Sequence, residues 1–185
     1  MARQRRESGH EDLAKLVLRG ATGSLMAGHG SQKGLGWFNG PGPEGTSGFM
    51  EMLGLAPGRP WANLAIASEL GGGTLTALGL LNPLGPLGII GSMGMAWATA
   101  HRGKPIWVTE GGAELPLTNI AASLALMLSG PGKYSLDRAL GIRLPRWIGP
   151  LGLAAILATV LYAGAGGEEP PAEDEAREGT AGEQD

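Results

Sequence analysis

One charged residue in a long apolar segment constrains this chain more than any other feature. Residues 61–81 are predominantly apolar, and Glu69 is the only charged residue among them. About 20 apolar residues are enough to cross the hydrocarbon core of a bilayer. A carboxylate at that depth costs several kcal/mol unless it is paired, protonated or beside a polar cavity. Glu69 is therefore predicted to have a partner and to mark a functional site.

The whole-chain averages conceal an apolar middle between two polar ends. The net charge of -3 and the mean hydropathy of +0.03 would suit a soluble domain. Glycine accounts for 34 of 185 residues, well above its usual share of about 7%. This excess fits helices in lipid, where small residues allow close approach. The chain has no cysteine, which excludes thiol–disulfide chemistry and a thiolate-held iron–sulfur cluster.

Five apolar stretches are predicted to be membrane spans, so the expected fold class is an all-α, polytopic transmembrane helix bundle. The stretches are residues 13–36, 61–81, 84–101, 112–129 and 148–166. Residues 1–12 are expected to form a polar N-terminal arm, and the acidic residues 168–185 a disordered tail. Between them lie a four-helix bundle over residues 13–137, then a connector and a fifth span over residues 138–167. Gly20, Ser24 and Gly28 recur every four residues and are expected to form a packing face of the first span.

Lysine and arginine residues are distributed unequally between the segments that five spans would place on opposite sides. An excess of these residues in short loops marks the cytoplasmic side. If the N terminus is cytoplasmic, nine of the 14 lie on the inner side: Arg3, Arg5, Arg6, Lys15, Arg19, Lys133, Arg138, Arg143 and Arg146. The five on the outer side are Lys33, Arg59, Arg102, Lys104 and Arg177. The bias predicts a cytoplasmic N terminus and an external tail.

Polar residues near the span ends gather on one side of the expected bundle, because consecutive spans alternate in direction. They are His29, Gln32, Lys33, Glu69, His101 and Glu114. The first three follow i, i+3, i+4 spacing and share one side of their helix. Glu69 shares its helix side with small residues, so a neighbouring helix can approach it. Glu69 is therefore expected to face His29 or Lys33.

Each of these residues also has a purely structural interpretation. A pair of Glu69 with Lys33 or His29 would fix the register of two helices. His101 precedes two basic residues and would then be a solvated helix end. Glu114 would be an acidic residue favoured by a helix dipole. A haem between the two histidines and a divalent metal on His and Glu are disfavoured, because the ligands differ in depth and lie on separate helices.

A series of short motifs resembles the DoxX family of bacterial membrane proteins. The motifs are HGSQK from His29, ELGGG from Glu69, His101, GAE ending at Glu114, and GPGKYSLD ending at Asp137. The resemblance covers residues 13–137 and implies a four-helix transmembrane bundle in the bacterial cytoplasmic membrane. The predicted fifth span and the acidic tail depart from that four-helix pattern.

The resemblance implies two classes of function. The first is the membrane subunit of a quinone-linked oxidoreductase, acting with a partner protein that carries the redox cofactor. The second is a non-catalytic membrane scaffold for redox and detoxification enzymes, or a small-solute carrier. Both place the chain in a lipid bilayer, and neither involves nucleic acid or an intrinsic cofactor or metal.

In the first class, the polar residues would form a quinone site near the outer interface. His29, Lys33 and Glu69 would serve as the proton and hydrogen-bond groups for the quinone ring. The full quinone-binding set would be His29, Gln32, Lys33, Glu69, His101 and Glu114. In the scaffold or carrier class, the same residues would be structural or would line a path.

Overall fold

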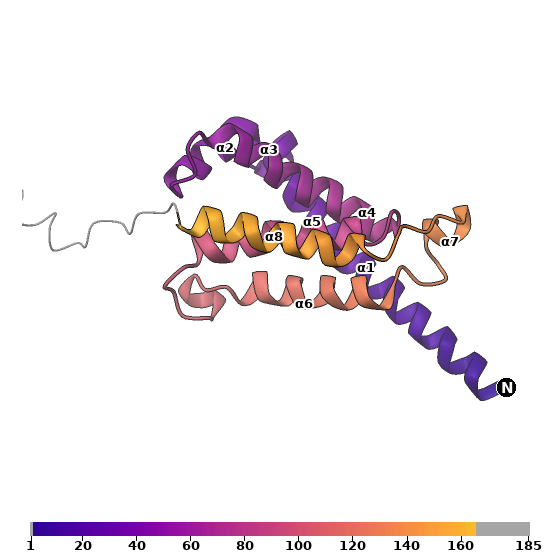
Figure 1. Ribbon diagram of the computed structural model, residues 1–185. Helices are drawn as coiled ribbons and strands as arrows, with labels where there is room; N and C mark the ends of the chain where they lie inside the picture. Colours follow the sequence, from indigo (N-terminus) through magenta and orange to yellow (C-terminus); the bar gives the residue numbers. More distant parts are fainter. Residues whose placement is uncertain (1, 166–185) are drawn as a thin grey trace, which may run out of the picture.

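The described part of the chain, residues 2–165, is built from helices and contains no strand (Figure 1). In this computed structural model, all five apolar stretches are helical, which confirms the all-α part of the predicted fold class. They form α1 (Ala2–Leu35), the end-to-end run of α3 (Gly58–Ile66), η2 (Ala67–Gly71) and α4 (Gly72–Leu78), then α5 (Leu84–Ala100), α6 (Glu114–Ser129) and α8 (Ile148–Ala165).

Short helices fill the connections: η1 (Trp37–Asn39), α2 (Gly42–Met52), η3 (Val108–Glu110) and α7 (Leu136–Leu140). Helix α1 already begins at Ala2, so the expected polar arm continues directly into the first apolar helix. Taken one at a time, the helices within residues 2–165 include none that combines the length and apolarity needed to cross a membrane. The expected tail, residues 168–185, lies outside the described residues, and the division into domains stays a prediction.

Helix α1 packs closely against the η2–α4 run through glycines on both sides of the contact. A side-chain carbon added at Gly30 would overlap the backbone of Leu70. One added at Gly73 would overlap the backbones of Gly23 and Ala27. Backbone therefore meets backbone along this contact, which is how small residues bring helices together.

The packing face expected for α1 is wrong. A side-chain carbon added at Gly20 or Gly28 would meet nothing within 4 Å, and Ser24 is exposed. The contact instead uses Gly23, Gly30 and neighbouring positions. Glycines occur on both sides of this helix, so four-residue spacing alone does not identify the side that faces a neighbour.

Helices α4 and α5 form the antiparallel hairpin that their short connection predicts (Figure 1). Gly72 lies against Gly85 and Gly88, again with almost no side-chain bulk between the helices. The turn is held by Asp137 of α7, whose two carboxylate oxygens accept the backbone N–H groups of Leu81 at 2.7 Å and Asn82 at 2.8 Å. These bonds attach the α6–α8 connection to the end of the hairpin.

Helices α6 and α8 complete the bundle by packing against α5. The beginning of α1, the α4–α5 turn and α7 lie at one end, whereas α2, the beginning of α3 and η3 lie at the other (Figure 1). Many large apolar side chains remain outside the core, among them Leu128 at 82% exposure and Tyr162 at 76%. The packed core thus coexists with an extensive apolar surface.

Candidate functional site

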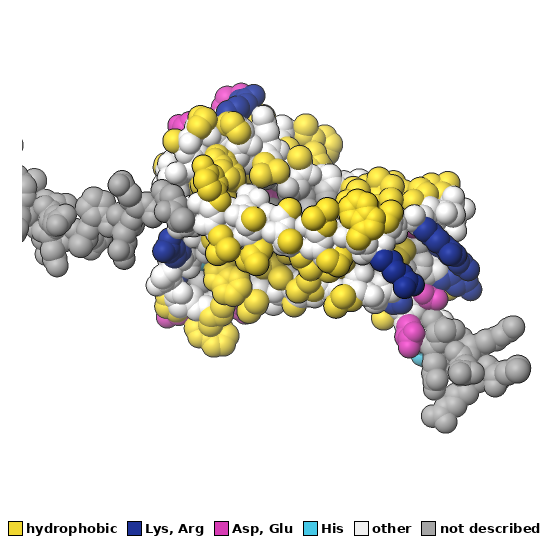
Figure 2. Space-filling model, in the orientation of Figure 1, with side chains coloured by type: hydrophobic (Ala, Val, Ile, Leu, Met, Phe, Trp, Pro, Cys, Tyr) yellow, Lys and Arg dark blue, Asp and Glu magenta, His cyan; other side chains and the backbone are white. Residues whose placement is uncertain are grey.

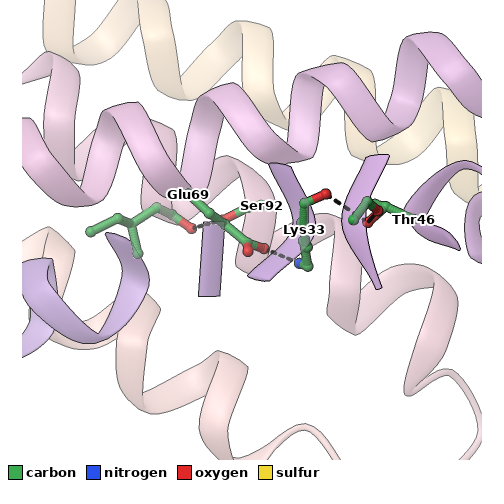
Figure 3. Close-up of polar contacts among 6 residues, drawn as sticks. Lys33, Thr46, Glu69 and Ser92 are labelled. Carbon is green, nitrogen blue, oxygen red and sulfur yellow. Dashed lines mark hydrogen bonds and ion pairs between the residues drawn. The ribbon is translucent and has the colours of Figure 1, made fainter. Parts of the chain in front are cut away.

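Lys33 near the end of α1 and Glu69 in η2 form an ion pair inside the bundle (Figure 3). The Nζ atom of Lys33 donates a hydrogen bond to Oε1 of Glu69 at 2.5 Å. The Glu69 side chain is 3% exposed and that of Lys33 is 29% exposed. Glu69 therefore has a charged partner, and that partner is Lys33, one of the two that the sequence left open.

The second carboxylate oxygen of Glu69 is left without a bond. Oε2 is buried and has no hydrogen-bond partner among the described residues. A buried acceptor in this condition is costly, so such groups commonly bind a ligand or an ordered water. The pair thus combines a satisfied charge with a free acceptor.

The backbone that carries Glu69 is unusual. Residues Ala67–Gly71 form a π-helical turn between α3 and α4. Such a turn contains one extra residue, which rotates the following side chains around the helix axis, and π-turns are frequent at functional sites. Ser68 and Glu69 both lie in this turn and both line the cleft described next.

An apolar cleft of about 360 Å³ opens beside the ion pair, a volume at the small end of the usual range for ligand pockets. Helices α2, α3, α5 and α8 form its walls, with apolar side chains that include Phe49, Trp61, Met95 and Ile156. A few hydroxyl groups interrupt the apolar lining: Ser68, Ser92, Thr99 and Thr159. A mostly apolar space with one buried charged pair suits an amphiphilic or aromatic ligand.

Polar contacts link helix α2 to α1 and α3 beside the ion pair. The hydroxyl of Thr46, itself 2% exposed, lies 2.7 Å from the carbonyl oxygen of Gly42 in its own helix and 3.2 Å from that of Lys33 (Figure 3). Its single proton is shared between these two acceptors. On the outside, Nη1 of Arg59 donates to Oε1 of Glu44 at 2.9 Å, and this bond lowers the pKa of the Glu44 carboxyl. These contacts hold the α2 wall of the cleft in place.

A comparison with known families covers the part of the chain that holds this site. Residues 14–102 match the sequence model of DoxX. Residues 14–102 form a DoxX-family domain. This DoxX match includes Lys33, Glu69 and all elements from α2 to α5, and it ends before η3. No curated protein and no solved structure matches the chain.

One wall of the cleft lies outside the DoxX match. Helix α8 contributes Gly152, Ala155, Ile156, Thr159 and Val160 to the lining. It reaches the DoxX helix α5 through small residues: a side-chain carbon at Gly94 would lie 3.4 Å from Val160, and one at Gly152 would overlap the side chain of Leu87. The expected fifth helix is therefore part of the candidate site.

Two sequence-predicted site residues of the DoxX helix α1 lie away from the cleft. His29 is exposed, although it shares a helix side with Lys33. Gln32 is half-buried and packs against Gly40 in the loop that follows α1. Lys33 reaches Glu69 because its long, flexible stem bends toward the contact, whereas the short His29 side chain cannot do so.

The remaining two predicted residues, His101 and Glu114, support the α5–α6 connection. Nδ1 of His101 lies 2.6 Å from the carbonyl oxygen of Gly111, and Oε2 of Glu114 accepts the N–H of Val108 at 3.0 Å. Neither residue lines the cleft. Of the six predicted residues, Lys33 and Glu69 line the cleft and the other four do not. The role of all six in quinone binding stays a prediction.

Sequence reasoning did not identify the hydroxyl-bearing residues and the aromatic wall of the cleft. Ser68, Ser92 and Thr99 recur in apolar helices, which is a weak signal because such side chains also bond their own helix, as Thr99 does to Met95. Trp61, at the start of the second apolar stretch, also lines the cleft. Within residues 2–165, no cluster of three or more His, Cys, Asp or Glu side chains could hold a metal.

Proposed function

We propose that the chain is a DoxX-family membrane protein whose cleft binds the ring of a lipid-soluble quinone. In this proposal it is the membrane subunit of an oxidoreductase whose partner carries the redox cofactor. The observation that carries the proposal is the Lys33–Glu69 pair beside an apolar cleft of about 360 Å³.

The surface supports the membrane part of this proposal. In Figure 2, apolar side chains spread over the middle of the visible face, and most charged groups lie toward its two ends. Exposed examples on the outer helices include Leu117, Leu151 and Leu157. Apolar patches of this extent mark protein or membrane contacts. The proposal rests on this surface and on the DoxX match, not on the length of any single helix.

The chemistry of the cleft supports the quinone part. A quinone ring is flat and apolar except for its two carbonyl oxygens, which become negatively charged as electrons arrive. The ammonium group of Lys33 can donate a hydrogen bond to one of these oxygens. Glu69 holds that group in position and keeps its charge balanced, and the hydroxyl of Ser68 offers a further donor. The hydroxyl of Ser92 already donates to the carbonyl oxygen of Ile89 at 3.1 Å.

The proton and electron sources follow from the position of the pair. Reduction of a quinone to a quinol takes two electrons and two protons. Lys33 is partly exposed, so it can pass protons from water to the ring oxygens. The sequence contains no cysteine. Its one G-x-G-x-x-G string, residues 40–45, follows the short helix η1 rather than a strand, although a dinucleotide-binding fingerprint requires a strand there. The electrons would therefore come from a flavin-bearing partner.

Filling the cleft is expected to prevent binding while leaving the ion pair intact. Ala155 of α8 lines the cleft, and Ala158 on the same helix is exposed and does not. With purified protein in nanodiscs, Ala155→Phe should weaken decylubiquinone binding at least about tenfold, a loss of ~1.4 kcal/mol. Ala158→Phe should bind as wild type does. Quenching of tryptophan fluorescence provides the measurement, because Trp61 lines the cleft.

Two results would count against the quinone proposal. One is a wild-type protein that does not bind decylubiquinone at all. The other is unchanged binding in Ala155→Phe. His29→Ala adds a further comparison, since the exposed His29 should be dispensable for binding.

A scaffold is the second candidate, and the enclosure of Glu69 favours it. A carboxylate that is 3% exposed and already paired can simply fix the register of α1 against η2. In that case Glu69→Gln membranes would support full partner-dependent quinone reduction. A quinone site instead requires that Glu69→Gln lowers the rate while the partner still assembles.

The membrane orientation makes a separate prediction. The connection around η3 is expected outside and the α7 region inside, as the lysine and arginine bias indicates. Because the chain has no cysteine, single cysteines can be introduced at the exposed positions Thr109 and Ala139. An impermeant thiol reagent added to intact cells should label Thr109→Cys alone. Labelling of Ala139→Cys alone would reverse the proposed orientation.

A further inference from the structure

Arg19, in the middle of α1, is buried at the end of the bundle opposite the cleft. It is 4% exposed, and its Nη2 donates to the backbone carbonyl of Tyr134 in the α6–α7 connection. The Gly79 backbone lies directly beside the guanidinium: a side-chain carbon at Gly79 would overlap Nη1 of Arg19. The bundle thus encloses a positive charge that the quinone proposal does not use.

Most of the hydrogen-bonding capacity of this guanidinium is unused. Nε and Nη1 of Arg19 are buried without a hydrogen-bond partner among the described residues, and the same holds for Oγ1 of Thr76. Arg19 and Thr76 line one small cavity of about 10 Å³, together with Gly79, Asn82 and other residues of the surrounding turns. Three unsatisfied polar atoms therefore belong to residues around a single small space.

Nearby carboxylates are committed to other groups. Asp137 accepts the N–H groups of Leu81 and Asn82, and Asp12 accepts the N–H of Lys133 at 2.9 Å. No carboxylate of the described side chains lies within ion-pair distance of Arg19. A buried cation without a counter-charge is strongly unfavourable.

We propose that this cavity binds one monatomic anion, of which chloride is the common example. A space of this volume is about that of one water molecule, which excludes sulfate, phosphate and carboxylates. A chloride ion is somewhat larger than a water molecule, so the lining side chains must move slightly outward when it binds. A halide can accept hydrogen bonds from Nε and Nη1 of Arg19 and from the Thr76 hydroxyl. It also neutralises the guanidinium, which a water molecule cannot do.

The bound anion would have a structural consequence. Arg19 contacts the α6–α7 connection through Tyr134 and borders the α4–α5 turn through Gly79. Neutralising Arg19 therefore stabilises the junction of three segments that are far apart in the sequence. The protein should be more stable in chloride than in a salt whose anion is too large to enter.

Thermal unfolding of the full-length protein in detergent tests this proposal at constant ionic strength. Replacing sodium gluconate with sodium chloride or bromide should raise the melting temperature by a few degrees in a saturable manner, whereas sodium sulfate should not. Arg19→Gln should abolish the halide dependence, and Thr76→Val should require several-fold more halide. Lys104→Gln removes an exposed positive charge and should leave the dependence unchanged.

Crystals grown in bromide give a direct measurement that does not depend on the stability of any variant. An anomalous peak between Arg19 and Thr76 is the expected result. No peak there, together with equal melting temperatures in chloride and gluconate, would mean that a water molecule fills the cavity and would overturn the proposal. Halide dependence that persists in Arg19→Gln would overturn it as well.

Discussion

Replacing Lys33 with methionine is expected to lower the free energy of unfolding by about 3–5 kcal/mol, because it leaves Glu69 buried without its counter-charge. The two partners are not equivalent. Glu69 is 3% exposed, whereas Lys33 is 29% exposed and can turn toward water when unpaired. Glu69→Leu should therefore cost less than Lys33→Met. Unfolding by sodium dodecyl sulfate in mixed micelles provides the measurement.

The double variant Lys33→Met, Glu69→Leu is the control for this experiment. Replacing a whole buried pair with apolar side chains is often neutral, so the double variant should recover most of the stability lost in Lys33→Met. A coupling energy near zero between the two positions would mean that the pair contributes nothing measurable to the fold. That outcome would also remove the argument that Glu69 positions Lys33 for a ligand.

The helical segments were predictable from the sequence because length and apolarity are properties of single segments. The stretches predicted at 61–81, 84–101, 112–129 and 148–166 correspond to helices whose ends differ by a few residues. The connection over residues 34–60 was less predictable. Its many glycine and proline residues are typical of a loop, yet Gly42–Met52 forms α2.

Contacts between helices were predicted less well, because they depend on rotation about each helix axis. Glycines at 20 and 28 have the same spacing as functional packing motifs, but the contact uses Gly23 and Gly30. The π-turn at Ala67–Gly71 adds a further rotation within the helix that carries Glu69. Sequence spacing does not reveal such a turn, so the partner of Glu69 could be narrowed only to His29 or Lys33.

The candidate site could be predicted only in part, because its contacts also depend on rotation about each helix axis. An isolated charge in an apolar segment is visible in the sequence, so Glu69 and a nearby cation could be identified. His101 and Glu114 share an end of the bundle with Glu69, but sharing an end does not imply contact. Each bonds a backbone group of its own connection instead. The α8 wall of the cleft depends on packing between distant segments, and no sequence motif indicates it.

Replacing Gly30 with leucine is expected to prevent stable folding, because the added side chain would overlap the backbone of Leu70 in η2. Close packing of two backbones leaves no room for relaxation, and neither helix can move apart without breaking the Lys33–Glu69 pair at the same contact. We expect the free energy of unfolding to fall by more than ~4–5 kcal/mol, a level that few single substitutions reach. Yield of folded protein and its melting temperature in detergent provide the measurement.

Gly28→Leu is the matched control for Gly30→Leu. Both glycines lie within α1, so replacing either one favours the helical backbone by roughly 1 kcal/mol. Gly28 differs from Gly30 because a side-chain carbon added there has nothing within 4 Å. Gly28→Leu should therefore be as stable as wild type or slightly more stable. If the two variants instead lose stability equally, α1 contacts its neighbours through Gly28 as well. The face formed by Gly20, Ser24 and Gly28 would then be a packing surface after all.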